Sequence, residues 1–172
     1  MDYFTLFELP ICYLIKDSLL TSRYQQLQLK FHPDKYIDQT ECERIQTVKY
    51  AATINKAYQT LKYPLKRAEY ILFLHGLDLE NRKNIIYDKA FLMEQLVLRE
   101  ELDVIMHMIN SQELLNNFAT RITQIIKKHS TQMLVNLEQH KWEEAADILC
   151  KLFFLDKLQL QIEQIEEKLL VL

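Results

Sequence analysis

The side chains best suited to polar recognition stand together in one short segment, His32-Pro33-Asp34. Near neutral pH an imidazole can donate or accept a hydrogen bond, and a carboxylate can accept two hydrogen bonds from one arginine. Proline stiffens the bend and lowers the entropy that the segment loses on binding. The segment is compatible with docking on a partner that offers an arginine, but taken alone it is more often a simple helix stop with two solvated side chains.

The rest of the sequence does not indicate a catalytic or metal-binding centre. The other histidines and the cysteines are dispersed, without a Cys-x-x-Cys or His-x-x-x-His pair: His75, His107, His129, His140, Cys12, Cys42 and Cys150. A single glycine excludes a glycine-rich phosphate loop. Because an enzyme needs convergent groups in a preorganised pocket, we expect no enzymatic activity, no metal site and no cofactor.

The composition predicts long helices and few loops. The chain has 172 residues with only one Gly and three Pro, the two residues that most often interrupt regular structure. The net charge of −3 and the lack of a dense basic stripe argue against nucleic-acid binding. No apolar run reaches membrane-spanning length, the first residues do not resemble a signal peptide, and dispersed cysteines suit a reducing compartment. We therefore expect a cytoplasmic protein without membrane contact.

The first half of the chain contains three helical patterns. Asp17 can cap a helix that begins at Ser18 and ends before Pro33, with one apolar face: Leu20, Tyr24, Leu27 and Phe31. Thr40 and Glu43 form a capping-box pattern before a second helix, whose apolar residues are Ile45, Val48, Ala52, Tyr58 and Leu61. The short connection predicts antiparallel packing of these two helices, and Pro64 begins a third.

The second half contains three longer helical patterns after a polar stretch around Gly76. They run from about residue 88 to 109, from a second capping-box pattern at 110–113, and from about residue 142 to the end. Each has one apolar stripe: Phe91, Leu98, Leu102, Ile105 and Ile109; then Leu115, Phe118, Ile122, Ile125, Met133 and Leu137; then Leu155, Leu158, Ile162, Ile165 and Leu169. The alternating three- and four-residue spacing of the last stripe is typical of a helical bundle.

Two sets of motifs resemble known families. A helix that ends in His-Pro-Asp-Lys is followed by a helix that contains Ile54-Asn55, Ala57-Tyr58, Leu61, Pro64, Arg67-Ala68 and Tyr70. This arrangement resembles a J domain. Further segments, residues 3–7, 91–96, 98–103 and 154–158, resemble HscB, the J-type co-chaperone family of bacterial iron–sulfur cluster assembly. The resemblance extends over essentially the whole chain.

The helical patterns and the resemblance together predict an all-α, L-shaped protein. We expect a J domain at residues 1–75, a linker at 76–86, and a three-helix bundle at 87–172 that binds a scaffold protein. The resemblance implies a co-chaperone that stimulates the ATPase of a specialised seventy-kilodalton heat-shock chaperone, HscA-like, and delivers an IscU-like iron–sulfur scaffold protein to it. We expect a monomer, with a homodimer as the alternative.

The resemblance also implies two groups of site residues. The ATPase would contact His32, Pro33, Asp34 and Lys35, with basic support from Arg23 and Lys30, which share a helix face. That support is small, because Leu29 stands where relatives often have a basic residue. The scaffold would contact the C-terminal bundle through Leu92, Met93, Leu96, Val97, Arg99, Glu100 and Phe153.

The apolar residues of this second group lie outside the stripes that fill the bundle core. Leu92, Met93, Leu96 and Val97 centre on the side of their helix opposite to Phe91 and Leu98, and Phe153 points away from the Leu155 stripe. Exposed apolar patches of this kind mark interaction sites; the alternative is packing against the J domain or the linker. Relatives commonly have an acid at Val97, which leaves the charged part of the contact open.

Two other functions remain compatible with the sequence. In one, the bundle associates with itself through the outward apolar patch, and the N-terminal hairpin is purely structural. In the other, the chain is a J protein that serves a different client. Stimulation of a heat-shock ATPase and binding to the scaffold protein distinguish these possibilities.

Overall fold

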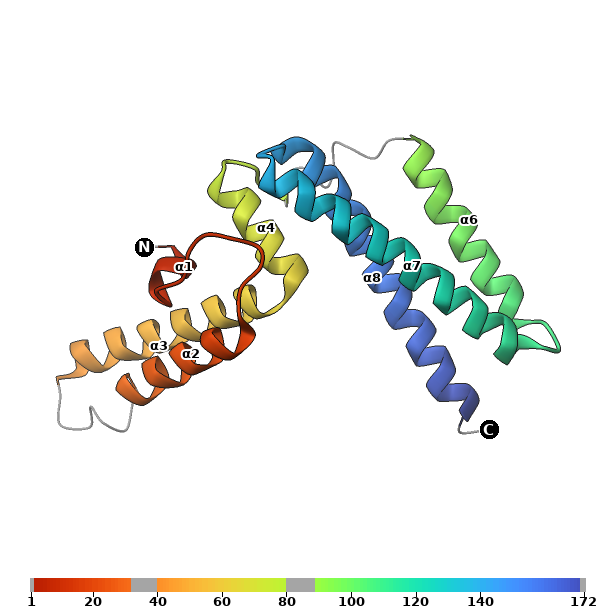
Figure 1. Ribbon diagram of the computed structural model, residues 1–172. Coiled ribbons are helices and arrows are strands. Elements are labelled where there is room, and N and C mark those ends of the chain that lie inside the picture. The colour runs from red at the N-terminus through yellow and green to blue at the C-terminus, as the bar shows by residue number, and fades with distance from the viewer. Residues whose placement is uncertain (1, 32–39, 80–88, 171–172) are drawn as a thin grey trace. The chain divides into compact units, whose positions relative to one another are not determined.

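The computed structural model describes residues 2–31, 40–79 and 89–170 (Figure 1). These residues form seven helices and contain no strand, which confirms the predicted all-α class: α1 Tyr3–Leu6, α2 Asp17–Lys30, α3 Glu41–Lys62, α4 Pro64–Leu74, α6 Lys89–Met106, α7 Ser111–Glu138 and α8 Trp142–Leu170. The chain divides into two compact units, Met1–Leu74 and His75–Leu172. Most of the predicted linker, residues 80–86, lies outside the described residues.

The N-terminal unit is built around the helical pair α2 and α3, which run side by side in opposite directions (Figure 1). The rings of Tyr24 and Tyr58 stack across the pair with their centroids 3.9 Å apart. The core combines residues from all four helices and the N-terminal segment: Phe4, Phe7, Leu20, Ile54, Ala57, Leu61, Ala68 and Leu72. The predicted antiparallel hairpin and the helix beginning at Pro64 are thus confirmed.

The predicted capping box at the start of α3 is also present. The carboxylate of Glu43 accepts hydrogen bonds from the backbone N–H of Thr40 at 3.1 Å and from its hydroxyl at 2.7 Å. These bonds stabilise the charged form and lower the pKa of Glu43. The second predicted box does not form, because the side chain of Asn110 makes no capping hydrogen bond at the start of α7.

The predicted apolar face of α3 is wrong in its first half. Ile45, Val48 and Ala52 are exposed. In this half of the helix Tyr50 packs instead against Phe31, the residue that follows α2, with the ring centroids 4.6 Å apart. At about 100° per residue, Ile45 and Val48 lie on roughly the opposite side of α3 from Tyr50. The side of α3 that packs is therefore the one that carries Tyr50, which the apolar pattern of the sequence did not predict.

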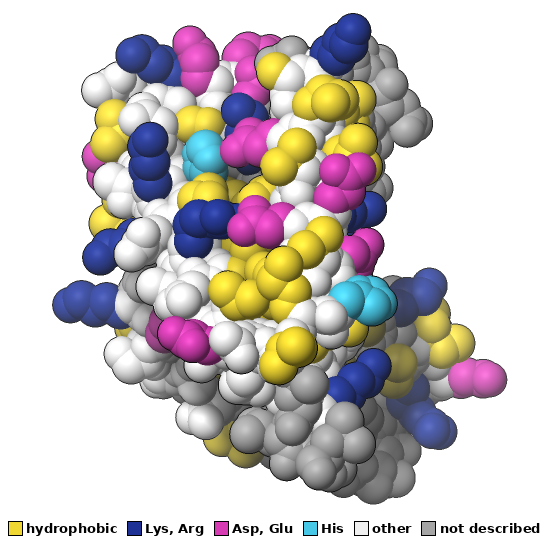
Figure 2. All heavy atoms as spheres, turned by 90° about the vertical axis from the view of Figure 1, so that its right-hand side faces the viewer, with side chains coloured by type: hydrophobic (Ala, Val, Ile, Leu, Met, Phe, Trp, Pro, Cys, Tyr) yellow, Lys and Arg dark blue, Asp and Glu magenta, His cyan; other side chains and the backbone are white. Residues whose placement is uncertain are grey.

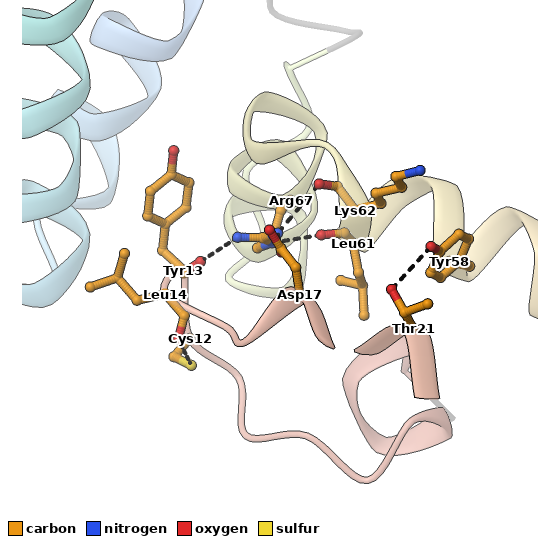
Figure 3. A network of polar contacts seen from close by, with 9 residues as sticks. All are labelled: Cys12, Tyr13, Leu14, Asp17, Thr21, Tyr58, Leu61, Lys62 and Arg67. Atoms are coloured by element: carbon orange, nitrogen blue, oxygen red, sulfur yellow. Dashed lines mark hydrogen bonds and ion pairs between the residues drawn. The ribbon is translucent and has the colours of Figure 1, made fainter. Parts of the chain in front are cut away.

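A buried arginine joins the segments at the base of the hairpin (Figure 3). The Arg67 side chain donates from Nε to the carbonyl oxygen of Leu61 at 2.6 Å, and from Nη1 to that of Tyr13 at 2.8 Å. It thereby satisfies a carbonyl group at the end of α3, where the helix supplies no partner. Burial lowers the pKa of Arg67, and the Asp17 carboxylate opposes that shift, so the guanidinium stays charged.

Asp17 therefore has a different role from the one predicted. The helix α2 begins at Asp17 itself, and Lys16 occupies the N-cap position without a side-chain hydrogen bond. The Asp17 carboxylate lies 3.5 Å from Nη2 of Arg67. Tertiary contact thus replaces the local cap that the sequence indicated.

The C-terminal unit consists of α6, α7 and α8, which share a hydrophobic core cluster: Phe91, Leu98, Leu102, Ile105, Leu115, Phe118, Ile122, Phe154, Leu155, Leu158 and Ile162. The predicted stripes supply all of these except Phe154. The prediction for Ile109 is wrong: α6 ends at Met106, and Ile109 is fully exposed in the turn before α7. Of the helices described here, none combines the length and the apolar character needed to cross a membrane.

Candidate functional site

The predicted ATPase-docking residues His32, Pro33, Asp34 and Lys35 lie outside the described residues. The helix α2 that leads to them is described to its last residue, Lys30. Its position on the α2–α3 pair is fixed by the core contacts of Leu20 and by the stacked tyrosines. The predicted docking residues follow this helix in the sequence.

The basic residues of α2 differ in their availability. Arg23 is half-buried and forms a 3.0 Å ion pair with Glu8. Lys30 is exposed, and its Nζ lies 5.4 Å from the centroid of the Phe31 ring. Because Glu8 already neutralises Arg23, long-range attraction of an acidic partner by this helix is weaker than the sequence suggests.

The second candidate surface is an apolar patch on α6. Four side chains are about half exposed there: Leu92 at 46%, Met93 at 53%, Leu96 at 48% and Val97 at 54%. We call these four residues the α6 patch. They lie on the side of the helix opposite to the core residues Phe91, Leu98 and Leu102, as predicted. Figure 2 shows hydrophobic side chains gathered between acidic and basic ones on this face of the molecule.

The charged residues of α6 around the patch differ in their contacts. Glu94, Glu100 and Asp103 are exposed. Glu101, in contrast, pairs with Arg121 of α7. Arg99 is exposed, but its guanidinium lies over the Phe154 ring, 5.4 Å from the centroid. The charged rim of the patch is therefore mainly acidic, while Arg99 covers an edge of the core.

On α8, the aromatic residue Phe154 meets α6. Its ring lies edge-on to that of Phe91, with centroids 6.1 Å apart and an interplanar angle of 88°. Phe153 is half-buried and points about 100° away from Phe154 around the helix. Sequence reasoning missed Phe154, although its four-residue spacing from Leu158 was a usable signal. The inclusion of Phe153 in the scaffold site stays a prediction.

His129 of α7 is influenced by charged side chains of both other helices of this unit, Lys151 of α8 and Glu94 of α6. His129 of α7 is half-buried, and burial is the main cause that lowers its pKa. The charges of Lys151 and Lys128 lower it further, whereas Glu94 of α6 raises it. Within the described part of the chain, no cluster of three or more His, Cys, Asp and Glu side chains could hold a metal ion.

Comparisons with known proteins match both units. Residues 9–70 match the DnaJ domain family, and residues 87–163 match the HSCB C-terminal oligomerisation domain. These two matches, one over the unit that contains α2 and α3 and one over the C-terminal helices, define a J-domain co-chaperone. The chain is 41% identical to chaperone HscB from Vibrio cholerae, with 98% of this chain and 99% of that chain covered and a TM-score of 0.88. It belongs to the HscB family of iron–sulfur cluster assembly.

Two further solved structures share the fold. Human co-chaperone protein HscB is 28% identical, with 96% of this chain and 82% of that chain covered and a TM-score of 0.86. The Jac1 co-chaperone from Saccharomyces cerevisiae is 21% identical, with 95% and 97% covered and a TM-score of 0.70. At that lower identity the similarity to Jac1 shows the fold alone.

Proposed function

We propose that this chain stimulates the ATPase of an HscA-like heat-shock chaperone and delivers to it an IscU-like scaffold protein. In this proposal the loop that contains His32, Pro33 and Asp34 contacts the ATPase, and the α6 patch binds the scaffold. The observation that carries the proposal is the patch itself. Four large apolar side chains are half exposed on a helix whose opposite side already fills the core.

The chemistry of the patch describes the surface that would cover it. Burying a Leu or Met side chain completely contributes about 1.5–3 kcal/mol, so covering the half-exposed α6 patch supplies a substantial part of a specific binding energy. Glu94, Glu100 and Asp103 at its edge favour basic groups on the partner. Val97, at the C-terminal end of the patch, favours an apolar contact there, where relatives commonly place an acid.

The proposed contact between the J domain and the ATPase would use only a few charged side chains of this chain. Lys30 is exposed at the end of α2, and Lys35 follows the tripeptide in the sequence. Arg23 is paired with Glu8. Asp34 offers a carboxylate that an arginine of the ATPase can bind through two hydrogen bonds. We also propose a cytoplasmic location, which three free cysteines fit.

The test combines an ATPase assay with a binding measurement. Steady-state ATP hydrolysis by an HscA-type chaperone is measured with this chain alone, with the scaffold alone and with both, and scaffold binding is measured by titration calorimetry. We expect stimulation by this chain alone, and a larger effect when the scaffold is present. Stimulation without any scaffold binding indicates a J protein for a different client. No stimulation, together with self-association in light scattering, supports the purely structural alternative.

A further inference from the structure

We propose that Met93 is an oxidation site, and that a peroxide, by converting its thioether to the sulfoxide, releases the partner bound at the α6 patch. The inference rests on the proposed scaffold binding. Met93 is 53% exposed and is one of the four patch residues. Leu96 and Val97 follow it by three and four residues, so they are its neighbours on the helix surface.

The reaction is a complete two-electron oxidation. The sulfur lone pair of Met93 attacks one oxygen of hydrogen peroxide, the O–O bond breaks, an S–O bond forms, and the remaining atoms leave as water. The sulfur is oxidised and the peroxide is reduced, and an organic peroxide leaves an alcohol instead. A sulfoxide reductase reverses the change with two thiols, which become a disulfide as the oxygen leaves as water.

Among the described methionines, Met93 is the only one whose oxidation would alter the α6 patch. Met106 and Met108 are as exposed as Met93, at 49% and 50%, but they lie at the end of α6 and in the turn that follows. Met133 is 0% exposed in α7. Three of these four side chains are thus similarly exposed to an oxidant in solution, and of the three only Met93 is in the patch.

The sulfoxide would act on binding rather than on folding. In the free protein its oxygen remains hydrated, because the side chain lies opposite the core residues of α6. When a partner covers the patch, that oxygen is removed from water among apolar groups, and an unpaired polar group in such a place is costly. The thioether, in contrast, is apolar and adaptable. We expect oxidation to weaken binding about tenfold or more.

The experiment compares peroxide-treated and untreated full-length protein. Scaffold affinity is measured by calorimetry with a purified IscU-type protein, and peptide mass spectrometry locates each added oxygen. Three forms are treated: the unaltered chain, Met93→Leu, and Met106→Leu/Met108→Leu, each compared with its own untreated sample. Dithiothreitol after treatment reduces disulfides and sulfenic acids at Cys12, Cys42 and Cys150 without reducing the sulfoxide.

After peroxide treatment we expect the unaltered chain and the Met106→Leu/Met108→Leu variant to bind the scaffold more weakly. The Met93→Leu variant should keep the affinity of its untreated sample. Sulfoxide reductase should restore binding, and Met93→Gln, which introduces a polar group without oxidant, should bind weakly. Equal losses in Met93→Leu, or full binding by protein that carries the Met93 sulfoxide, would overturn the inference. If untreated protein does not bind the scaffold, the proposed function fails and this inference fails with it.

Discussion

Arg67 and Asp17 form an ion pair between a buried guanidinium and an exposed carboxylate, 3.5 Å apart. The asymmetry predicts very different costs for removing the two partners. Arg67→Ala leaves the carbonyl groups of Tyr13 and Leu61 without a donor and opens a cavity, so the free energy of unfolding should fall by about 2–4 kcal/mol. Asp17→Asn removes one solvent-screened charge and should cost less than about 1 kcal/mol.

Chemical denaturation of the full chain, followed by circular dichroism, measures both changes. Arg67→Lys is the matched control, because it keeps the charge but cannot reproduce the planar fork that reaches two carbonyl groups at once. It should fall between the other two variants. Equal stability of Arg67→Ala and Asp17→Asn would show that the buried hydrogen bonds contribute little.

The tripeptide is predicted to govern the ATPase partner without affecting the fold. His32→Gln or Asp34→Asn should abolish stimulation of ATP hydrolysis, because the first removes the imidazole and the second removes the negative charge that the predicted contact needs. Scaffold affinity and the melting temperature should stay nearly unchanged, since neither side chain has a predicted core role. Hydrolysis assays, calorimetry and thermal melts on the same samples check this. Unfolding of either variant would assign the segment a structural role.

The apolar residues proposed to bind the scaffold are predicted to affect binding and stability separately. The triple variant Leu92→Ala/Met93→Ala/Phe153→Ala should weaken scaffold binding on the order of a hundredfold, because truncation of interface anchors often costs more than about 2 kcal/mol. Calorimetry measures the affinity. Truncating Leu92 and Met93 should change the free energy of unfolding little, because both side chains are exposed. Phe153 is half-buried, so the single variant Phe153→Ala is measured as well.

Phe154→Ala is the matched control for this variant. Phe154 is buried against Phe91, so its truncation should lower the free energy of unfolding by about 3–5 kcal/mol. A triple variant that melts as readily as Phe154→Ala would place the predicted site in the core. Unchanged affinity and stability in the triple variant would mean that the bundle binds through another face.

The stability of the C-terminal unit should decrease in mild acid because of His129. Its pKa is lowered in the folded protein, first by burial and then by Lys151 and Lys128, with Glu94 acting in the opposite sense. Below the ordinary value of 6.5 the unfolded chain therefore binds more protons at this site than the folded chain. The free energy of unfolding should fall as the pH decreases through that value.

His129→Gln should remove part of this dependence, because glutamine does not titrate. Denaturation curves at several pH values between neutrality and mild acid, for the unaltered chain and the variant, give the two slopes. His140→Gln is a suitable control, since His140 is exposed in the turn between α7 and α8. A variant as acid-sensitive as the unaltered chain would contradict the assignment.

Local sequence patterns determined the helical class, the helix boundaries within a few residues, and the two short motifs that resemble a J domain and HscB. They also separated the α6 patch from the core stripe of the same helix, because the helical period alone decides which side chains share a face. The capping box of Thr40 and Glu43 was predictable for the same reason: its partners are three residues apart.

Only the tertiary structure decided which face of α3 meets its neighbour in the first half of that helix. Ile45 and Val48 form an apolar face that no helix of the described chain buries, while Tyr50 packs against Phe31. Phe154 packs edge-on against Phe91 of α6, and Arg67 is buried because carbonyl groups of Tyr13 and Leu61 converge on it. Residue spacing specifies faces within one helix, whereas these contacts depend on where separate segments meet in space.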